Sequence, residues 1–148
     1  MNETPKPRLV GLNHVALEVG DVQEALAFYS KIFDFELRGQ GPGRVFIDMG
    51  DQFLALMEAR RQENDKHRHF GLVVDDRSRV RELARSAGAT MLDGAFLDFL
   101  DPWGNRIQVV EYRDLQFTKA PAVLRGMQLA HLDKSEKAKE ELAAKGLG

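Results

Sequence analysis

The chain has 148 residues, which is enough for one domain with a full core or for two small half-domains that share one. Its composition, with 43% hydrophobic residues, 30% charged residues and a formal net charge of -2, is that of an ordinary soluble protein and excludes the basic excess that nucleic-acid or anionic-membrane binding favours. The chain has no cysteine, so disulfides, thiolate nucleophiles and zinc–sulfur sites are excluded, and a metal site would need His, carboxylate or amide ligands.

The start of the chain predicts no targeting or membrane element. Residues 1–9 are polar and proline-containing, and we expect them to form a loose arm. They lack the apolar segment of a signal peptide, and the chain nowhere approaches the roughly 18 continuous apolar residues of a membrane span. We therefore expect a cytoplasmic protein with neither a membrane nor a nucleic-acid partner.

The segment LNHVALEV predicts a strand with two different faces. Its apolar residues occupy one face, while His14, Ala16 and Glu18 occupy the other. His14 therefore points away from the main apolar face. Residues 22–33 then place apolar side chains at helical spacing, with Asp21 as the N-cap.

A glycine turn and a hairpin complete the first half. Gly39, Gly41 and Gly43 with Pro42 mark the turn. The alternating runs RVFIDMG and QFLALMEA follow, joined by a GD dipeptide, which is a hairpin signal. The first module, residues 10–58, is expected to run strand, helix, strand, strand, strand.

The second half repeats this pattern after a linker predicted at residues 59–67. Charges of both signs without periodicity favour a solvated linker there over a nucleic-acid site. The second module, residues 68–112, has a strand in HFGLVVDD, a helix in SRVRELARSAG, a turn at Gly88, and strands in AFLDFL and NRIQVVEY. The chain is thus a tandem duplication over residues 10–112.

Equivalent residues follow from the spacing of the two copies. His14 and His69 are 55 residues apart, whereas Glu58 and Glu111, like Phe46 and Phe99, are 53 apart. At the later spacing, Ala55 is the counterpart of Gln108. Each module then begins with a histidine on the less apolar face and ends with an inward position.

We predict an α+β fold in which two βαβββ modules form a curled mixed-sheet cup with helices on the outer face. The interior of the cup would be lined by small and polar groups, which suits a small ligand. Residues expected there are His14, Ala16, Ala55, His69, Gly71 and Gln108.

Residues 113–148 form a predicted helical extension. A weakly amphipathic stretch precedes a final helix at about residues 135–145, which Gly146 ends. The segment has too few large apolar residues to fold alone, so we expect it to pack on the domain or on a second subunit.

Three motifs in order resemble the vicinal oxygen chelate superfamily, which includes glyoxalase I, bleomycin resistance proteins, extradiol dioxygenases and methylmalonyl-CoA epimerase. They are LNHVALEVGDVQEALAFYSKIFDFEL, HFGLVVDD and LDPWGNRIQVVEY, and the resemblance covers residues 10–112. It implies a cup that holds one divalent ion (Fe, Mn, Ni or Zn), commonly completed by a dimer partner. We accordingly expect a homodimer.

Carried over by motif, the metal-ligand positions of that family are His14, Ala55, His69 and Gln108. Ala55 has no donor and Gln108 is a neutral amide where Glu is frequent, so the resemblance implies a metal site of His14, His69 and Gln108 that is weaker than one with a carboxylate. For Gln108 a hydrogen-bonding role is the alternative. For the two histidines the alternative is a polar pocket lining without metal.

The missing carboxylate also bears on catalysis, because moving a proton needs a base within hydrogen-bond reach. Glu18 and Asp48 share the inward parity of their strands and are the candidate substitutes, with a rim or salt-bridge role as the alternative. Glu58 and Glu111 lie an odd three residues from the ligand positions, which puts them on the opposite face as solvated strand ends.

Two functional hypotheses result. The first is a glyoxalase/dioxygenase-like protein that acts on or binds a small oxygenated compound in the cup with a partly degenerate divalent metal site. If it is an enzyme, a lyase, isomerase or dioxygenase reaction is implied, and the sequence leaves open whether it is one. The second is a metal-free binding protein of the bleomycin-resistance type. Trp103 either covers its hairpin, closes the pocket or contacts a partner.

Overall fold

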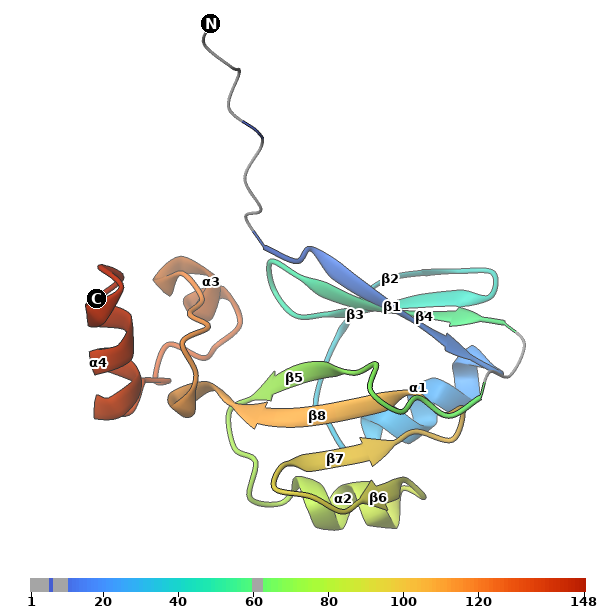
Figure 1. The fold of residues 1–148 in the computed structure, drawn as a ribbon. Helices are drawn as coiled ribbons and strands as arrows, with labels where there is room; N and C mark the ends of the chain where they lie inside the picture. The colour runs from blue at the N-terminus through green and yellow to red at the C-terminus, as the bar shows by residue number, and fades with distance from the viewer. Residues whose placement is uncertain (1–5, 7–10, 60–62) are drawn as a thin grey trace, which may run out of the picture.

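Two four-stranded sheets and four α-helices make up the part of the chain that the computed structural model describes, namely residue 6, residues 11–59 and residues 63–148. The predicted N-terminal arm lies outside the described residues except for Lys6, as do residues 60–62 of the predicted linker. Figure 1 shows one sheet above the other, with the C-terminal helices to one side.

The first module forms sheet A, in the strand order β1-β4-β3-β2. Strand β1 pairs in parallel with β4, and the other pairs are antiparallel. The elements are β1 (His14–Val19), α1 (Val22–Ser30), β2 (Leu37–Gly41), β3 (Arg44–Asp48) and β4 (Phe53–Glu58). Strand β2 occupies most of the predicted glycine turn, so the turn itself is confined to Pro42 and Gly43.

The second module forms sheet B with the same topology, β5-β8-β7-β6, and again a parallel first pair. Its elements are β5 (Phe70–Val74), α2 (Val80–Ser86), β6 (Thr90–Leu92), β7 (Leu97–Leu100) and β8 (Arg106–Glu111). The predicted tandem βαβββ fold is confirmed. Strand β6 was not predicted, because three residues are too few to show an alternating pattern.

Equivalent glutamates at the ends of β4 and β8 bind the starts of the helical segments. Oε1 of Glu58 accepts a hydrogen bond from the backbone N–H of Val22 at 3.2 Å, and Oε1 of Glu111 accepts one from Arg77 at 2.9 Å. Asp21 caps α1 as predicted, accepting from the N–H of Glu24 at 2.8 Å. The two glutamates are therefore structural, and the prediction that they leave the ligand face is confirmed.

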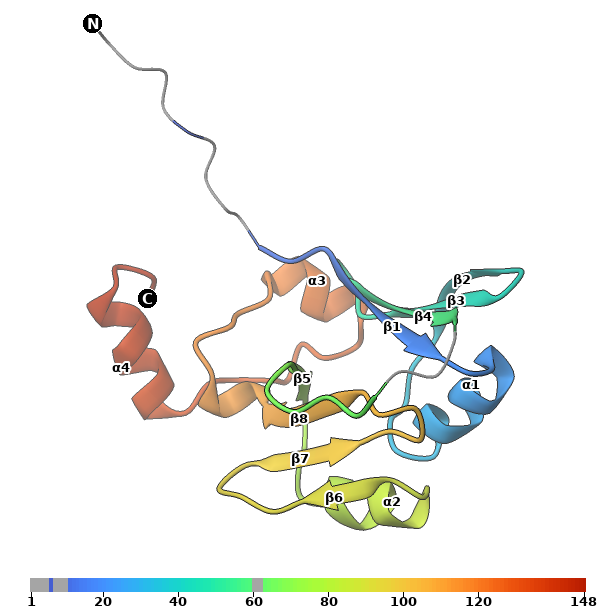
Figure 2. The ribbon, with the colours of Figure 1, turned by 45° about the vertical axis from the view of Figure 1, so that its right-hand side comes forward.

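Helix α1 lies between the two sheets, as Figures 1 and 2 both show. Phe28 of α1 contacts Phe99 of β7, with ring centroids 6.3 Å apart, and the buried face of α1 also packs on β4. One continuous hydrophobic core therefore serves both modules. Its members come from both sheets and both module helices, and the largest fully buried side chains are Tyr29, Phe99, Leu56, Ile107, Val19, Val45 and Val109.

This arrangement decides where the candidate ligand residues lie. Each sheet packs one face on the shared core and leaves the other face without a helix; we call these the helix-free faces of sheets A and B. Since α1 separates the core faces, the helix-free faces point away from one another. The sheet that was expected to curl into one cup is thus two separate sheets, and a single chain does not close the cup.

The C-terminal extension runs from the second module to the first. It contains a 3-10 turn (Tyr112–Asp114), α3 (Pro121–Gly126) and α4 (Glu136–Ala144). Lys119 pairs with Asp51 in the β3–β4 turn and donates to the carbonyl of Met49 at 2.8 Å. The predicted final helix is confirmed as α4, which Ser135 caps and Gly146, at φ 75°, follows.

None of the helices in the described residues has the length and apolar character needed to cross a membrane.

Candidate functional site

The helix-free face of sheet A carries aromatic and cationic groups around His14. The His14 ring stacks on Phe53, with centroids 4.6 Å apart and planes 10° apart. Phe46 meets Phe53 edge-on at 5.3 Å, and the guanidinium of Arg38 lies 4.7 Å from the Phe53 centroid. A register shift between Leu37 and Gly39 accompanies Arg38, and such bulges re-aim side chains. Sequence periodicity did not single out this arginine.

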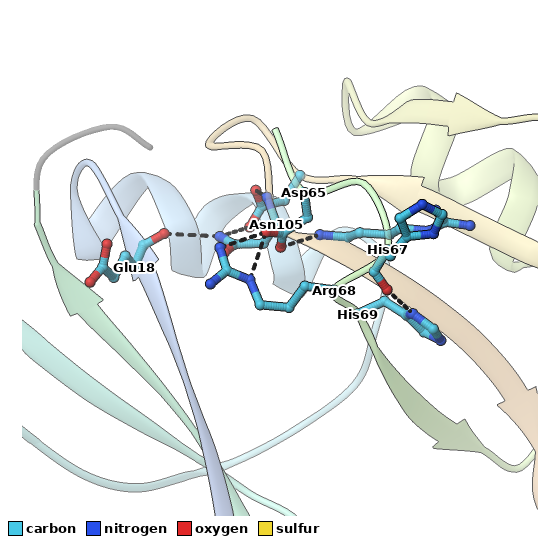
Figure 3. A network of polar contacts seen from close by, with 8 residues as sticks. Glu18, Asp65, His67, Arg68, His69 and Asn105 are labelled. Carbon is cyan, nitrogen blue, oxygen red and sulfur yellow. Dashed lines mark hydrogen bonds and ion pairs between the residues drawn. The ribbon is translucent and has the colours of Figure 1, made fainter. Parts of the chain in front are cut away.

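In both candidate histidines Nδ1 lies close to an oxygen of a preceding residue, a backbone carbonyl in one case and a side-chain amide in the other. Nδ1 of His69 lies 2.8 Å from the backbone carbonyl oxygen of His67, as the dashed line in Figure 3 shows, and Nδ1 of His14 lies 2.8 Å from Oδ1 of Asn13. An oxygen acceptor requires Nδ1 to carry the proton, which leaves the lone pair on Nε2. Both rings are solvent-exposed, so each offers Nε2 to a ligand outside the chain.

The segment before His69 is fixed by a carboxylate. Asp65 accepts two hydrogen bonds from Arg68, at 2.9 and 2.8 Å, and one from the backbone N–H of Arg106 at 3.2 Å. Its own N–H donates to the carbonyl of Gly104 at 2.8 Å. Figure 3 shows this network between the segment and the β7–β8 turn. The approach to β5, and with it His69, is therefore anchored on the second module.

The helix-free face of sheet B carries Gln108 and a carboxylate that the sequence analysis missed. Nε2 of Gln108 donates to Oδ1 of Asp98 at 3.2 Å. Arg106 donates to Oδ2 of the same carboxylate from Nε at 2.8 Å and from Nη2 at 2.7 Å. Asp98 is only 4% exposed.

Asp98 was missed because the assumed spacing of 53 residues does not hold along β3 and β7. Gln108 pairs with Asp98 and Ala55 pairs with Phe46, so Asp98, not Phe99, is the counterpart of Phe46. The second hairpin is one residue longer than the first, which turns Phe99 into the core. The one signal in the sequence was the polar side chain of Asp98 within the otherwise apolar run AFLDFL.

The candidate catalytic carboxylates lie on the helix-free face of sheet A, as their parity predicted. Glu18 is exposed on β1, and its backbone carbonyl accepts from Nδ2 of Asn105 at 2.9 Å. Asp48 is half-buried on β3, and its Oδ1 accepts from the N–H of Gly50 at 2.9 Å.

Trp103 and a buried tyrosine join the two modules. Trp103 meets the edge of Phe28 at 6.4 Å and packs on Gly20, where an added Cβ would lie 2.7 Å from its indole Nε1. The hydroxyl of Tyr29 donates to Oδ2 of Asp101 at 2.7 Å. Burial raises the pKa of Asp101, opposed by its hydrogen bonds, and burial together with the Asp101 charge raises the pKa of Tyr29. Trp103 is therefore a packing residue between modules.

A metal site fits this chain in donor type but not within one copy. The available donors are Nε2 of His14, Nε2 of His69 and Oε1 of Gln108, a nitrogen and oxygen set that divalent transition ions accept. Residues 11–59 and 63–148 contain no cluster of three or more His, Cys, Asp or Glu side chains that could hold an ion. Because the helix-free faces diverge, His14 would meet His69 or Gln108 only across two copies of the chain.

Residues 11–109 match the model of the Glyoxalase/Bleomycin resistance protein/Dioxygenase superfamily. The chain belongs to this superfamily. The match spans both modules and stops just short of the C-terminal extension, in agreement with the predicted resemblance to the vicinal oxygen chelate proteins.

Similar curated proteins include two transferases. The chain is 28% identical over 113 residues to glutathione transferase FosA of Serratia marcescens, covering 68% of this chain and 80% of FosA. It is 24% identical over 116 residues to metallothiol transferase FosB of Bacillus licheniformis, covering 69% of this chain and 75% of FosB.

Solved structures share the fold. The fosfomycin resistance protein FosX of Mesorhizobium loti has a TM-score of 0.60 at 18% identity, covering 69% of this chain and 91% of FosX. A FosX variant of Listeria monocytogenes, in complex with Mn(II) and 1S,2S-dihydroxypropylphosphonic acid, has a TM-score of 0.61 at 17% identity, covering 81% of this chain and 99% of that one.

Proposed function

We propose that this protein binds a small oxygenated molecule between two copies of the chain, the helix-free face of sheet A in one copy facing that of sheet B in the other. A divalent ion would be held weakly by His14, His69 and Gln108. The observation that carries the proposal is the repeated histidine geometry, in which Nδ1 is bound to an oxygen and Nε2 is left for a ligand in both modules.

The homodimer is part of the proposal because the two faces diverge, so that a second copy is needed to bring them together. Ala16 and Gly71 are exposed on β1 and β5, the edge strands of their sheets, where small residues leave room for a ligand. A bound divalent ion polarises oxygen atoms of its ligand as a Lewis acid. Glu18 and Asp48 are the residues that we propose for moving a proton on the bound molecule.

The relatives indicate where substrate tests should begin. Fosfomycin resistance proteins recur among the similar chains, and one of their structures holds Mn(II) with a dihydroxypropylphosphonic acid. Fosfomycin and related small phosphonates, with Mn²⁺ added and with glutathione or another thiol as co-substrate, are therefore the first compounds to test.

The structure also supports the second candidate, a metal-free binding protein. Ala55 supplies no donor at a position where the family has a ligand, and Phe46, Phe53 and Arg38 form an aromatic and cationic surface beside it. Such a surface binds planar molecules by stacking without any ion. This candidate predicts ligand binding that survives chelation.

The deciding experiment measures bound metal and oligomeric state together. We expect untagged protein incubated with Mn²⁺ to retain the ion and to sediment as a dimer, and we expect His14→Ala and His69→Ala each to lose it. His131→Ala is the matched control, because this exposed histidine lies outside both sheets. A monomer that retains no Mn²⁺, Fe²⁺, Ni²⁺ or Zn²⁺ would refute the metal-binding dimer and favour the second candidate if ligand binding persists.

A further inference from the structure

The side chain of Gln108 has a buried carboxylate beside it, that of Asp98, its partner on β7. Nε2 of Gln108 donates to Asp98, which is 4% exposed and ion-paired with Arg106. A carboxylate in an ion pair only accepts hydrogen bonds, so the NH₂ group of the carboxamide must face Asp98. The carboxamide oxygen, Oε1, is then the atom left for a molecule on the helix-free face of sheet B.

We propose that Asp98 is a positioning residue for the candidate ligand site. It fixes the orientation of the Gln108 carboxamide so that Oε1 faces the ligand, and it supplies, one hydrogen bond behind, the negative charge that a glutamate at this position would supply itself. The orientation stands on the structure of this chain alone; what Oε1 meets rests on the proposed function.

The physical reason is that a side-chain amide both donates and accepts hydrogen bonds, whereas a carboxylate only accepts them. A free glutamine presents its oxygen or its NH₂ group about equally well, whereas Asp98 leaves only one of the two orientations without a buried clash of acceptors. Donation to a carboxylate also polarises the amide and makes its oxygen a better acceptor and metal ligand. The oxygen of the neutral Gln108 side chain thereby carries more negative charge, as a carboxylate oxygen would.

The two modules provide an internal comparison. At the equivalent place in sheet A, Ala55 pairs with Phe46, and both are apolar. In sheet B, Gln108 pairs with Asp98, so the amide and the carboxylate occur together in the same module. Burying a carboxylate is costly without partners, and Arg106 and Gln108 are the partners that make Asp98 tolerable here.

The first test is independent of any ligand. In a ¹⁵N-labelled protein, the side-chain NH₂ signals of Gln108 are identified by their disappearance in Gln108→Glu. We expect one of the two protons to exchange slowly with water and to lose this protection in Asp98→Leu, which has a similar size and no acceptor. Unchanged shifts and exchange in Asp98→Leu, with the fold intact by its backbone spectrum, would overturn the proposal.

The second test uses Mn²⁺ as the probe and a double-mutant cycle. Asp98→Asn should weaken Mn²⁺ binding about 10-fold, the lower end of what an outer partner of a metal ligand contributes. Gln108→Glu alone puts a second carboxylate against Asp98 and should gain little, whereas the same change in the Asp98→Asn background should bind Mn²⁺ more tightly than wild type. Additive effects would mean that Asp98 does not act through Gln108.

A matched variant separates positioning from general stability. Asp51→Asn also removes an ion-paired aspartate, the partner of Lys119, away from sheet B. We expect it to lower the melting temperature without changing Mn²⁺ affinity; an equal loss of affinity in both variants would overturn the proposal. If wild type binds no Mn²⁺, the metal part of the proposed function fails, and the exchange measurement on Gln108 still decides the role of Asp98.

Discussion

The hydrogen bond between Tyr29 and Asp101 makes the sharpest prediction about stability, because it joins the helix of one module to the turn of the other. Tyr29 is 1% exposed and Asp101 is 4% exposed. In Tyr29→Phe, Asp101 keeps its contacts with the side chain of Asn105 and with the backbone N–H groups of Trp103 and Asn105, at 2.8, 2.9 and 2.9 Å. The variant therefore removes one donor from a carboxylate that retains three.

The magnitude follows from that count. A hydrogen bond to a charged group contributes about 1.5–3 kcal/mol, and the remaining donors place the loss near the middle, at about 2 kcal/mol. For a chain of this length, each kcal/mol lowers the melting temperature by about 2–4 °C. Tyr29→Phe should accordingly melt about 4–8 °C below wild type.

The effect should depend on pH with a defined sign. Tyr29 lowers the pKa of Asp101 against the larger effect of burial, so its removal raises that pKa further. The difference between wild type and variant is then present when Asp101 is ionised and shrinks as pH falls through its folded pKa. Above about pH 10, Tyr29 loses its proton in the unfolded state but keeps it in the folded state, where its pKa is raised. This difference lowers the stability of wild type as pH rises, and it is absent from Tyr29→Phe.

Urea unfolding, followed by circular dichroism and by the fluorescence of Trp103, the single tryptophan, measures these differences. Tyr112→Phe is the control, because it removes the hydroxyl of the other tyrosine, whose ring meets Phe117 edge-on. A loss below about 0.5 kcal/mol at neutral pH, or a loss that does not vary between about pH 4 and 7, would show that Tyr29 contributes by packing alone.

Two further predictions concern the contact of the C-terminal extension with the first module. Gly50→Ala should lower the free energy of unfolding in urea by at least about 1 kcal/mol more than Gly88→Ala does. Both glycines have positive φ, 84° and 93°. A Cβ at Gly50 would lie 2.6 Å from Sδ of Met127, whereas a Cβ at Gly88 would have no atom of another residue within 4 Å. Equal losses of stability in the two variants would mean that Met127 moves away from the added Cβ without a measurable change in the free energy of unfolding. The hydrogen bond from Lys119 lowers the pKa of Asp51, so the stabilisation by this pair is present above the unfolded pKa of 3.8 and is lost as pH falls from there through the lower folded pKa. Lys119→Met should therefore make the melting temperature less sensitive to acid. Added salt should reduce the difference in melting temperature between Lys119→Met and wild type.

Local patterns predicted the elements that have regular spacing. The alternation around His14, the cap at Asp21 and the charged helix after Ser135 each depend on neighbours within a few residues, and all three are confirmed. Strand β2 has the sequence LRGQG and was read as a turn, because its pairing with β3, rather than its own residues, makes it a strand.

The candidate site depended on information that no local pattern holds. The position of Asp98 depends on one extra residue in a hairpin, and a shift of one residue reverses the face of every side chain on the strand. The direction in which the helix-free faces point depends on where α1 packs, which is set by the core as a whole. Trp103 was placed on the right turn, but its contacts with Phe28 and Gly20 are between modules.

The insertion of α1 between the sheets also has a consequence for folding and for how the chain can be divided. A fragment that ends after β4 would expose the side of Phe28 that Phe99 covers. A fragment that begins at β5 would keep α2 but would lack α1, which covers part of its core face. Each fragment alone should therefore be unfolded or aggregate, since burial of about one large aromatic side chain is worth several kcal/mol, a sizeable part of the stability of a domain. Mixed together, the two fragments should reconstitute the native chain as a noncovalent complex, because the contacts that hold the halves together come from packing rather than from the linker.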